Sequence, residues 1–170
     1  MTQRVVVTGL GIVCGLGFDW ETFWNALVAG KSAICRWQMD SAVGFPVQYA
    51  APVDDAAFAQ EVADMPELRQ PMERRSRFGL LAAHRALRDA GLAAQGSRIG
   101  VAVGSGVPER SAADMMLALG EDGPRWDRLY ARRGERDPSL RNGNDHLAAL
   151  IARRHGVLGP VMNFSTACAG

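Results

Sequence analysis

The stretch VMNFSTACAG, residues 161–170, decides the fold that the sequence predicts. Its first half, residues 161–165, predicts a β-strand, and the small residues after it predict a turn that leads into a helix. A cysteine at the start of such a helix has a lowered thiol pKa, because unpaired amides and the helix dipole stabilise the thiolate. The same amides can hold a developing oxyanion. This pattern makes Cys168 a candidate nucleophile, with Ala167 small enough to admit a substrate carbonyl.

A second interpretation of Cys168 stays open on spacing alone. A free cysteine is often a small buried hydrophobic residue without chemical function.

Outward from this stretch, strands alternate with helices along the chain. Short apolar runs predict strands at Val5–Thr8 and 98–103. Helical periodicity and capping residues predict helices over 19–29, 73–90 and 145–155, and shorter ones near 55–63 and 112–119. The first helix carries one apolar stripe, and the prolines of residues 37–71 predict an otherwise irregular segment. The alternation indicates an α/β fold with a mainly parallel sheet.

Composition narrows the class of protein. The 170 residues are 48% hydrophobic and carry a net charge of +1, which predicts a folded domain and argues against disorder and a nucleic-acid-binding surface. No apolar run approaches the roughly 18 residues of a membrane span, and no signal-peptide pattern is present. The three cysteines, without a CxxC motif, fit a reducing compartment, so we expect a cytoplasmic protein with no membrane association.

Two other kinds of site are weakly indicated. The glycine-rich TGLGIVCG, residues 8–15, follows a predicted strand, but a dinucleotide-binding GxGxxG motif needs glycine where Cys14 stands. No acidic residue lies between Val28 and Ile34 to bind a ribose, so a plain tight turn is the favoured interpretation. His84, His146 and His155 lack metal-ligand spacing, and no metal site is predicted.

Five segments, in order, resemble the β-ketoacyl-acyl carrier protein synthases, the condensing enzymes of fatty acid and polyketide synthesis. They are RVVVTGLGIV (4–13), FWNAL to GKSAI (23–34), RF to DAGL (77–92), RIG to GSG (98–106) and GVLGP to TACA (156–169). The resemblance implies a thiolase-like fold, a layered α/β/α/β/α architecture with a mainly parallel mixed sheet. Residues 1–170 would be an incomplete N-terminal β-ketoacyl synthase domain, most of the first of two similar halves.

By this resemblance, Cys168 accepts an acyl group from a carrier thioester, and a decarboxylated malonyl thioester then attacks it. That chemistry implies no metal and no organic cofactor, because the phosphopantetheine arm of an acyl carrier protein brings the activated thioester. Val107 resembles the family position at the far end of the acyl pocket near the dimer interface, although a plain core valine is an equal alternative. The expected partners are an acyl carrier protein and a second synthase subunit, in a homodimer or a heterodimer.

A basic cluster is the candidate surface for the carrier protein. Arg69, Arg74, Arg75 and Arg77 lie within nine positions, with Glu73 as the acidic residue among them. Because the family's carriers are acidic, an exposed cluster would steer them towards the site. A solvated helix start or an internal ion pair is the alternative interpretation.

The departures from the family pattern limit the prediction. The family's two catalytic histidines follow the nucleophile, and none of the three histidines of this chain stands at a matching place. We therefore expect these residues either to be a segment of a longer polypeptide or to be completed by a second chain. An acyltransferase that does not condense, and a non-condensing partner subunit, are the alternative functions. Acyl chain length and pathway are not predicted.

Overall fold

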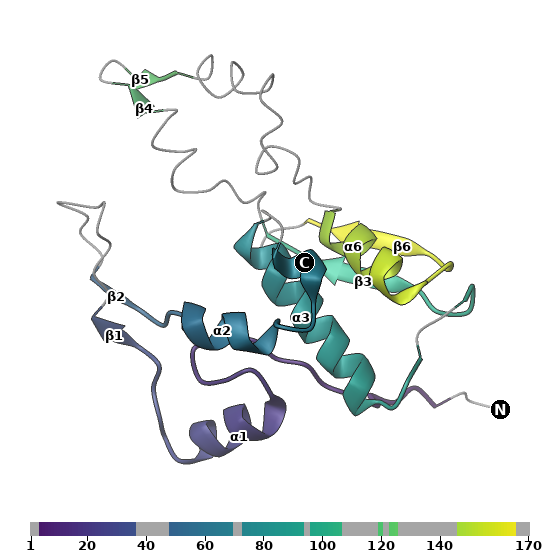
Figure 1. Ribbon diagram of the computed structural model, residues 1–170, viewed down its shortest axis with the longest axis horizontal. Coiled ribbons are helices and arrows are strands. Elements are labelled where there is room, and N and C mark those ends of the chain that lie inside the picture. The colour runs from purple at the N-terminus through teal and green to yellow at the C-terminus, as the bar shows by residue number, and fades with distance from the viewer. Residues whose placement is uncertain are drawn as a thin grey trace. The chain divides into compact units, whose positions relative to one another are not determined.

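The computed structural model describes residues 4–36, 48–69, 73–93, 96–106, 119–120, 123–125 and 146–165 (Figure 1). The chain divides into two compact units. The first contains residues up to Pro66 and Leu81–Ala93, and the second contains Glu67–Leu80 and the residues from Ala94 onward. The long helix α3, Arg74–Asp89, contributes its first half to the second unit and its second half to the first.

The helix α1, Trp20–Val28, begins and ends as its sequence predicts. The carboxylate of Asp19 accepts a hydrogen bond from the Thr22 backbone N–H at 2.8 Å, which satisfies one of the unpaired amides at the helix start. After the helix, Gly30 adopts φ +68°, a left-handed conformation that glycine takes without steric cost. Both ends of α1 are therefore set locally.

We expect Asp19→Ala to lower the free energy of unfolding by about 1 kcal/mol, the usual cost of losing an N-cap. The Thr22 hydrogen bonds lower the pKa of the Asp19 carboxyl below its ordinary value of 3.8. A lowered folded-state pKa adds stability above pH 3.8 that disappears as the pH falls further. Urea unfolding at pH 7 and at pH 3 measures both effects. Asp19→Asn keeps the acceptor, so a loss in this control as large as in the alanine variant would contradict the assignment.

The apolar stripe of α1 is present, but α1 has no buried residue. Trp24 is 52% exposed, and with Trp20 and Phe23 it lines an open groove against the segment Leu10–Ile12. The buried residues of this unit centre instead on α2, Asp55–Glu61, and the residues after it. They are Phe58, Val62, Met65 and Leu81. The expected short helix near 55–63 is thus confirmed as α2, which contributes Phe58 to this unit's core.

The strand predicted at Val5–Thr8 is wrong. These residues form no ladder with any strand in the described ranges, and Val5 and Val7 are 97% and 81% exposed. A run of β-branched residues favours extended backbone, but a strand also needs a hydrogen-bonding partner. The segment 37–71, expected to be irregular apart from a short helix, also contains the strand β2, Tyr49–Ala50, which pairs antiparallel with β1, Cys35–Arg36, just before that segment. Strands of two residues are too short to leave a sequence pattern.

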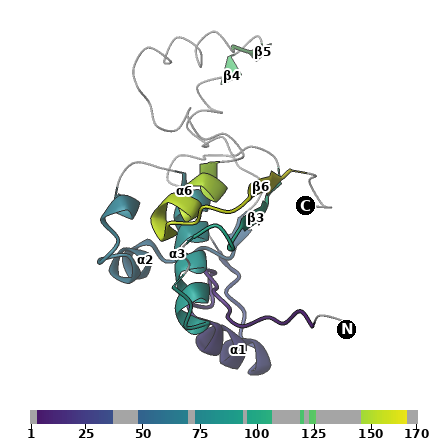
Figure 2. The same cartoon turned by 90° about the vertical axis from the view of Figure 1, so that its right-hand side faces the viewer.

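The second unit is built on a parallel strand pair, as predicted. The strand β3, Val101–Gly104, pairs in register with β6, Val161–Phe164, and the helix α6, His146–His155, packs against both (Figures 1 and 2). Gly79 of α3 also lies against the Leu147 side chain of α6. The buried apolar residues of this unit come from these elements, from the short 3-10 helix Pro66–Arg69 and from the segment between α6 and β6. They are Leu68, Leu80, Val101, Ala148, Ala152 and Val157.

The helix expected near 112–119 lies outside the described residues except for Leu119. That residue belongs to the short strand β4, Leu119–Gly120, which pairs with β5, Gly123–Pro124. The expected helix therefore does not extend to Leu119.

Candidate functional site

The candidate site lies at the carboxyl ends of β3 and β6. Parallel strands present their loops at this edge of a sheet, where α/β proteins usually bind ligands. The loop after β3 begins with Ser105, whose backbone N–H donates to the Phe164 carbonyl at 2.8 Å. The strand β6 ends at Phe164, and the chain continues through Ser165 towards Cys168. The first residue of the loop after β3 is therefore held to the last residue of β6.

Side chains also connect the loop after β3 to β6 and to the residue that follows β6. The Ser105 hydroxyl lies 3.3 Å from both amide atoms of Asn163, so it can donate to Oδ1 or accept from Nδ2. The Ser165 hydroxyl donates to the Gly106 carbonyl at 2.9 Å. We call these contacts, together with the Ser105–Phe164 backbone bond, the loop clamp. The residues of the loop clamp were not predicted from the sequence. Asn163, between Met162 and Phe164, was nevertheless a sign of a special role, since asparagine is depleted in strands.

The residues predicted to meet the substrate follow the loop clamp directly. Cys168 and Ala167 lie outside the described residues, and so does Val107. The described chain reaches Ser165, three positions before Cys168, and Gly106, the position before Val107. The helix-terminus activation of Cys168 and the acyl-pocket role of Val107 stay predictions.

The other two cysteines lie in different surroundings. Cys14 is half-buried in a turn in which its backbone N–H donates to the Gly17 carbonyl at 3.0 Å. Cys35 is exposed in β1, and both thiols are free. They are therefore internal references for the reactivity of Cys168.

The basic cluster is only partly an exposed surface. Arg74 is exposed, with its guanidinium carbon 5.0 Å from the centre of the Phe78 ring. Arg75 forms an ion pair with Glu73 at 3.2 Å, and their side chains are 25% and 7% exposed. Arg69 ends the 3-10 helix, and its side chain is outside the described part of the chain. Arg75 thus matches the alternative interpretation of an internal ion pair. Among the arginines of the basic cluster whose side chains the structure describes, Arg74 is the one that is exposed and can meet a partner.

Gly9 and Gly11 have a structural role that neither the dinucleotide-binding interpretation nor the tight-turn interpretation predicts. An added Cβ at Gly9 would collide with the Ala86 carbonyl of α3, and one at Gly11 would collide with the Ala82 carbonyl. The backbone N–H of Leu10, between them, donates to the Asp89 carboxylate at 2.9 Å. The segment therefore lies directly on α3, and its glycines permit close packing. The tight turn lies further on, at residues 14–17.

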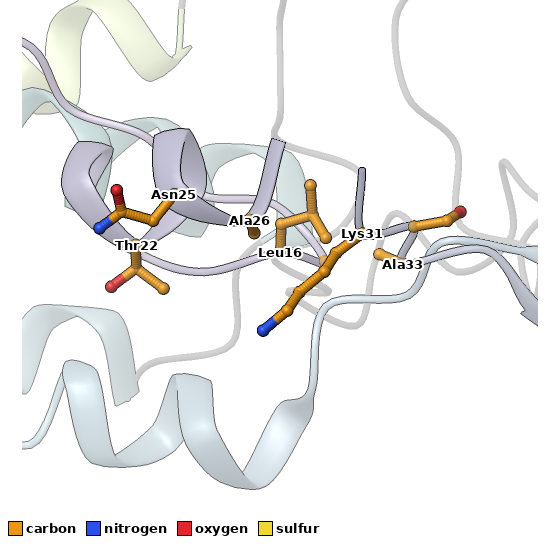
Figure 3. Close-up of a pocket in the computed structure, with 8 residues that line it drawn as sticks. Leu16, Thr22, Asn25, Ala26, Lys31 and Ala33 are labelled. Atoms are coloured by element: carbon orange, nitrogen blue, oxygen red, sulfur yellow. The ribbon is translucent and has the colours of Figure 1, made fainter. Parts of the chain in front are cut away.

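A shallow pocket of about 460 Å³ lies beside α1 (Figure 3). Its lining includes Lys31, the chain's only lysine, together with Thr22 and Asn25. Figure 3 shows the polar ends of these three side chains pointing in different directions, so they do not converge on one ligand atom.

The described residues offer neither a metal-binding cluster nor a membrane-spanning helix. No group of three or more His, Cys, Asp or Glu side chains within those ranges could hold a metal ion. None of the helices in the described part of the chain is both long and apolar enough to cross a membrane.

Comparison with known proteins finds one family over almost the whole chain. The family described as "Beta-ketoacyl synthase, N-terminal domain" matches residues 2–170. A putative polyketide beta-ketoacyl synthase 1 of Streptomyces halstedii is 34% identical, over 99% of this chain and 40% of that protein. The 3-oxoacyl-[acyl-carrier-protein] synthase 2 of Vibrio cholerae is 31% identical, over 98% of this chain and 39% of that protein. The chain thus spans about two fifths of the length of these relatives.

Solved structures agree on the fold. A type II polyketide ketosynthase in complex with its acyl carrier protein matches 99% of this chain and 39% of its own, with a TM-score of 0.67 and 24% identity. The ishigamide ketosynthase/chain length factor matches 95% of this chain and 39% of its own, with a TM-score of 0.66 and 22% identity. These likenesses confirm the expected α/β, thiolase-like fold class.

Proposed function

We propose, from the premise that this chain belongs to the β-ketoacyl synthase family through its N-terminal domain, that it forms the acyl-accepting part of a condensing enzyme. We call the whole enzyme of which this chain is the proposed part the complete synthase. The observation that carries the proposal is the family match over residues 2–170, which includes Cys168 at the end of the strand–turn stretch.

The proposed reaction has two stages. The Cys168 thiolate attacks the carbonyl of an acyl-carrier thioester, a new C–S bond forms, the C–S bond to the carrier breaks, and the carrier leaves as its thiolate. A malonyl thioester then loses CO2, and the electrons of the broken C–C bond form a carbanion that attacks the acyl-Cys168 carbonyl. The new C–C bond expels Cys168 as a thiolate and leaves a 3-oxoacyl thioester on the carrier. Covalent capture thereby divides a difficult bond formation into easier steps.

The proposed chemistry needs no metal and no organic cofactor, because the thioester of the acyl carrier is already activated. A second, related subunit is part of the proposal, and a similar solved structure described as a ketosynthase/chain length factor supports it. The free thiols of Cys14 and Cys35 suit a reducing compartment, so we propose that the synthase works in the cytoplasm.

The test of the function is to mix the complete synthase with an acyl-carrier thioester, with and without malonyl-carrier. Mass spectrometry of the digested protein should find the acyl group on the peptide that contains Cys168. With malonyl-carrier present, a 3-oxoacyl product should accumulate and CO2 should be released. An acyl-Cys168 peptide with no product would favour the alternative of a non-condensing acyltransferase, and no acyl-enzyme at all would reject the proposal.

We propose further that Arg74 helps to dock the acyl carrier protein. In the complete synthase, Arg74→Glu should raise the KM for the carrier about threefold to tenfold at low ionic strength and change kcat little, because surface charges mainly steer association. The difference from wild type should shrink as salt is added. Steady-state kinetics at two salt concentrations measures this.

The matched control is Arg88→Glu, which reverses an exposed charge in the last turn of the same helix. Its KM should stay near the wild-type value. An Arg75 substitution is a poor test, because it would leave the largely buried Glu73 carboxylate without this ion pair. Equal KM increases in the Arg74 and Arg88 variants would reject specific docking at Arg74.

A further inference from the structure

We infer that Asn163 and Ser165 are positioning residues for Cys168, acting through the loop clamp. The inference rests on the proposed function, since it concerns how the acyl-accepting cysteine is held. It goes beyond that function because it assigns a role to side chains that carry no part of the chemistry.

The positions of the clamp contacts support this role. Asn163 and Ser165 stand two positions apart, and they contact the adjacent residues Ser105 and Gly106. The backbone bond from Ser105 to Phe164 lies between these two contacts. Three successive residues of the chain are thus held to the β3 loop, and the last of them is three positions before Cys168.

The choice of residue types is informative. Val161, Met162 and Phe164 are good strand formers, whereas asparagine is depleted in strands. A valine at position 163 would suit the strand better, so the asparagine costs local strand preference. Residues that break a local preference often serve function. In this place the amide of Asn163 has a definite contact, the half-buried Ser105 hydroxyl.

The loop clamp also connects the two segments that the family resemblance assigns to the substrate. The strand β6 leads to Cys168, and the loop after β3 leads through Gly106 to Val107. A hydrogen bond in an exposed loop contributes little to global stability. Placement of a reacting atom is far more sensitive, since an error of about 1 Å can cost on the order of 100-fold in rate. The clamp should therefore affect rate much more than stability.

The test uses Asn163→Val and Ser165→Ala in the complete synthase, with Ser165→Thr as the rescue variant that keeps a hydroxyl. We expect each of the first two to lower kcat for condensation about 10-fold to 100-fold, with the carrier KM and the unfolding temperature near wild type. Ser165→Thr should recover most of the lost kcat. Ser32→Ala is the matched control, because it removes a loop serine hydroxyl that accepts a hydrogen bond from the Ile34 N–H at 3.1 Å.

A second readout separates positioning from general damage. The pH dependence of iodoacetamide labelling of Cys168, followed by peptide mapping, reports its thiolate fraction. In Asn163→Val and Ser165→Ala the midpoint should move up towards the ordinary thiol pKa of about 8.5, while labelling of Cys35 stays unchanged. Two substitutions at separate contacts keep the test decisive if one of them impairs folding.

The outcomes distinguish the inference from the proposed function. Wild-type kcat and an unchanged Cys168 labelling profile in both variants would overturn the positioning role, even with acyl-Cys168 forming normally. Absence of any acyl-Cys168 in the wild-type synthase would instead remove the proposed function itself. A loss of kcat that Ser165→Thr fails to recover and that Ser32→Ala reproduces would also overturn the inference.

Discussion

Replacing Cys168 by alanine is expected to lower the condensation rate of the complete synthase by at least about 1,000-fold. Loss of a covalent nucleophile removes the whole acyl-transfer route, and effects of this kind are commonly a factor of 1,000 or more. The unfolding temperature should change little, because alanine is close to cysteine in size. Product formation from acyl-carrier and malonyl-carrier, and the acylated-peptide assay, give independent measurements of the loss.

The other cysteines provide the matched controls. Cys14→Ala and Cys35→Ala should keep condensation within about twofold of wild type, since the proposed reaction forms its covalent intermediate on Cys168 alone. Cys14 lies in a turn and Cys35 in the two-residue strand β1, and both are free thiols. Condensation at the wild-type rate in the Cys168 variant, or its loss in the Cys35 variant, would refute the assignment.

Gly11→Ala is expected to destabilise the protein by about 2–3 kcal/mol, a large effect for one methyl group. The new Cβ would collide with the Ala82 carbonyl of α3 and lie 2.8 Å from the Ala86 backbone nitrogen. Because both neighbours are backbone atoms inside a helix, no change of rotamer relieves the contact. Because the unfolding entropy grows with chain length, the thermal unfolding midpoint of the complete synthase should fall by only about 2–4 °C, measured by calorimetry or circular dichroism.

Gly79→Ala makes the same chemical change on α3 itself. Its Cβ would meet the end of the Leu147 side chain, its two methyl groups and Cγ, which can move away more easily than backbone atoms. Alanine also favours a helix more than glycine does, by about 1 kcal/mol. The unfolding midpoint of this variant should therefore change much less than that of Gly11→Ala. A larger loss at Gly79 than at Gly11 would show that the Gly11 segment does not lie on α3 as described.

Much of the fold was predictable because its signals are local. The ends of α1 follow from Asp19 and Gly30, and α6 ends before Gly156, which adopts φ +63°. Capping residues and left-handed glycines act within one helical turn, so they can be recognised without knowledge of the partners. The parallel pairing of β3 with β6 was also indicated, since a helix lies between the two apolar runs.

For the candidate site, the sequence indicated a nucleophile, which stays a prediction, but it did not indicate the side chains around the loop ends. The strand–turn stretch pointed to Cys168, and the ordered segments pointed to the family, whose match over residues 2–170 confirms the resemblance. The loop clamp was not predicted, because Ser105 and Asn163 are 58 positions apart and meet only through the register of two strands.

By itself, the sequence determined where α1 and α6 begin and end, that β3 and β6 are parallel, and which family the chain belongs to. Only the tertiary structure decided that Val5–Thr8 forms no ladder with a described strand, that Gly9 and Gly11 serve close packing on α3, and that Arg75 is paired with Glu73. Capping and periodicity depend on neighbours within a few residues. Strand pairing and close backbone contact depend on groups from distant parts of the chain, and burial of a charge depends on the packing around it. Only the folded arrangement specifies those neighbours.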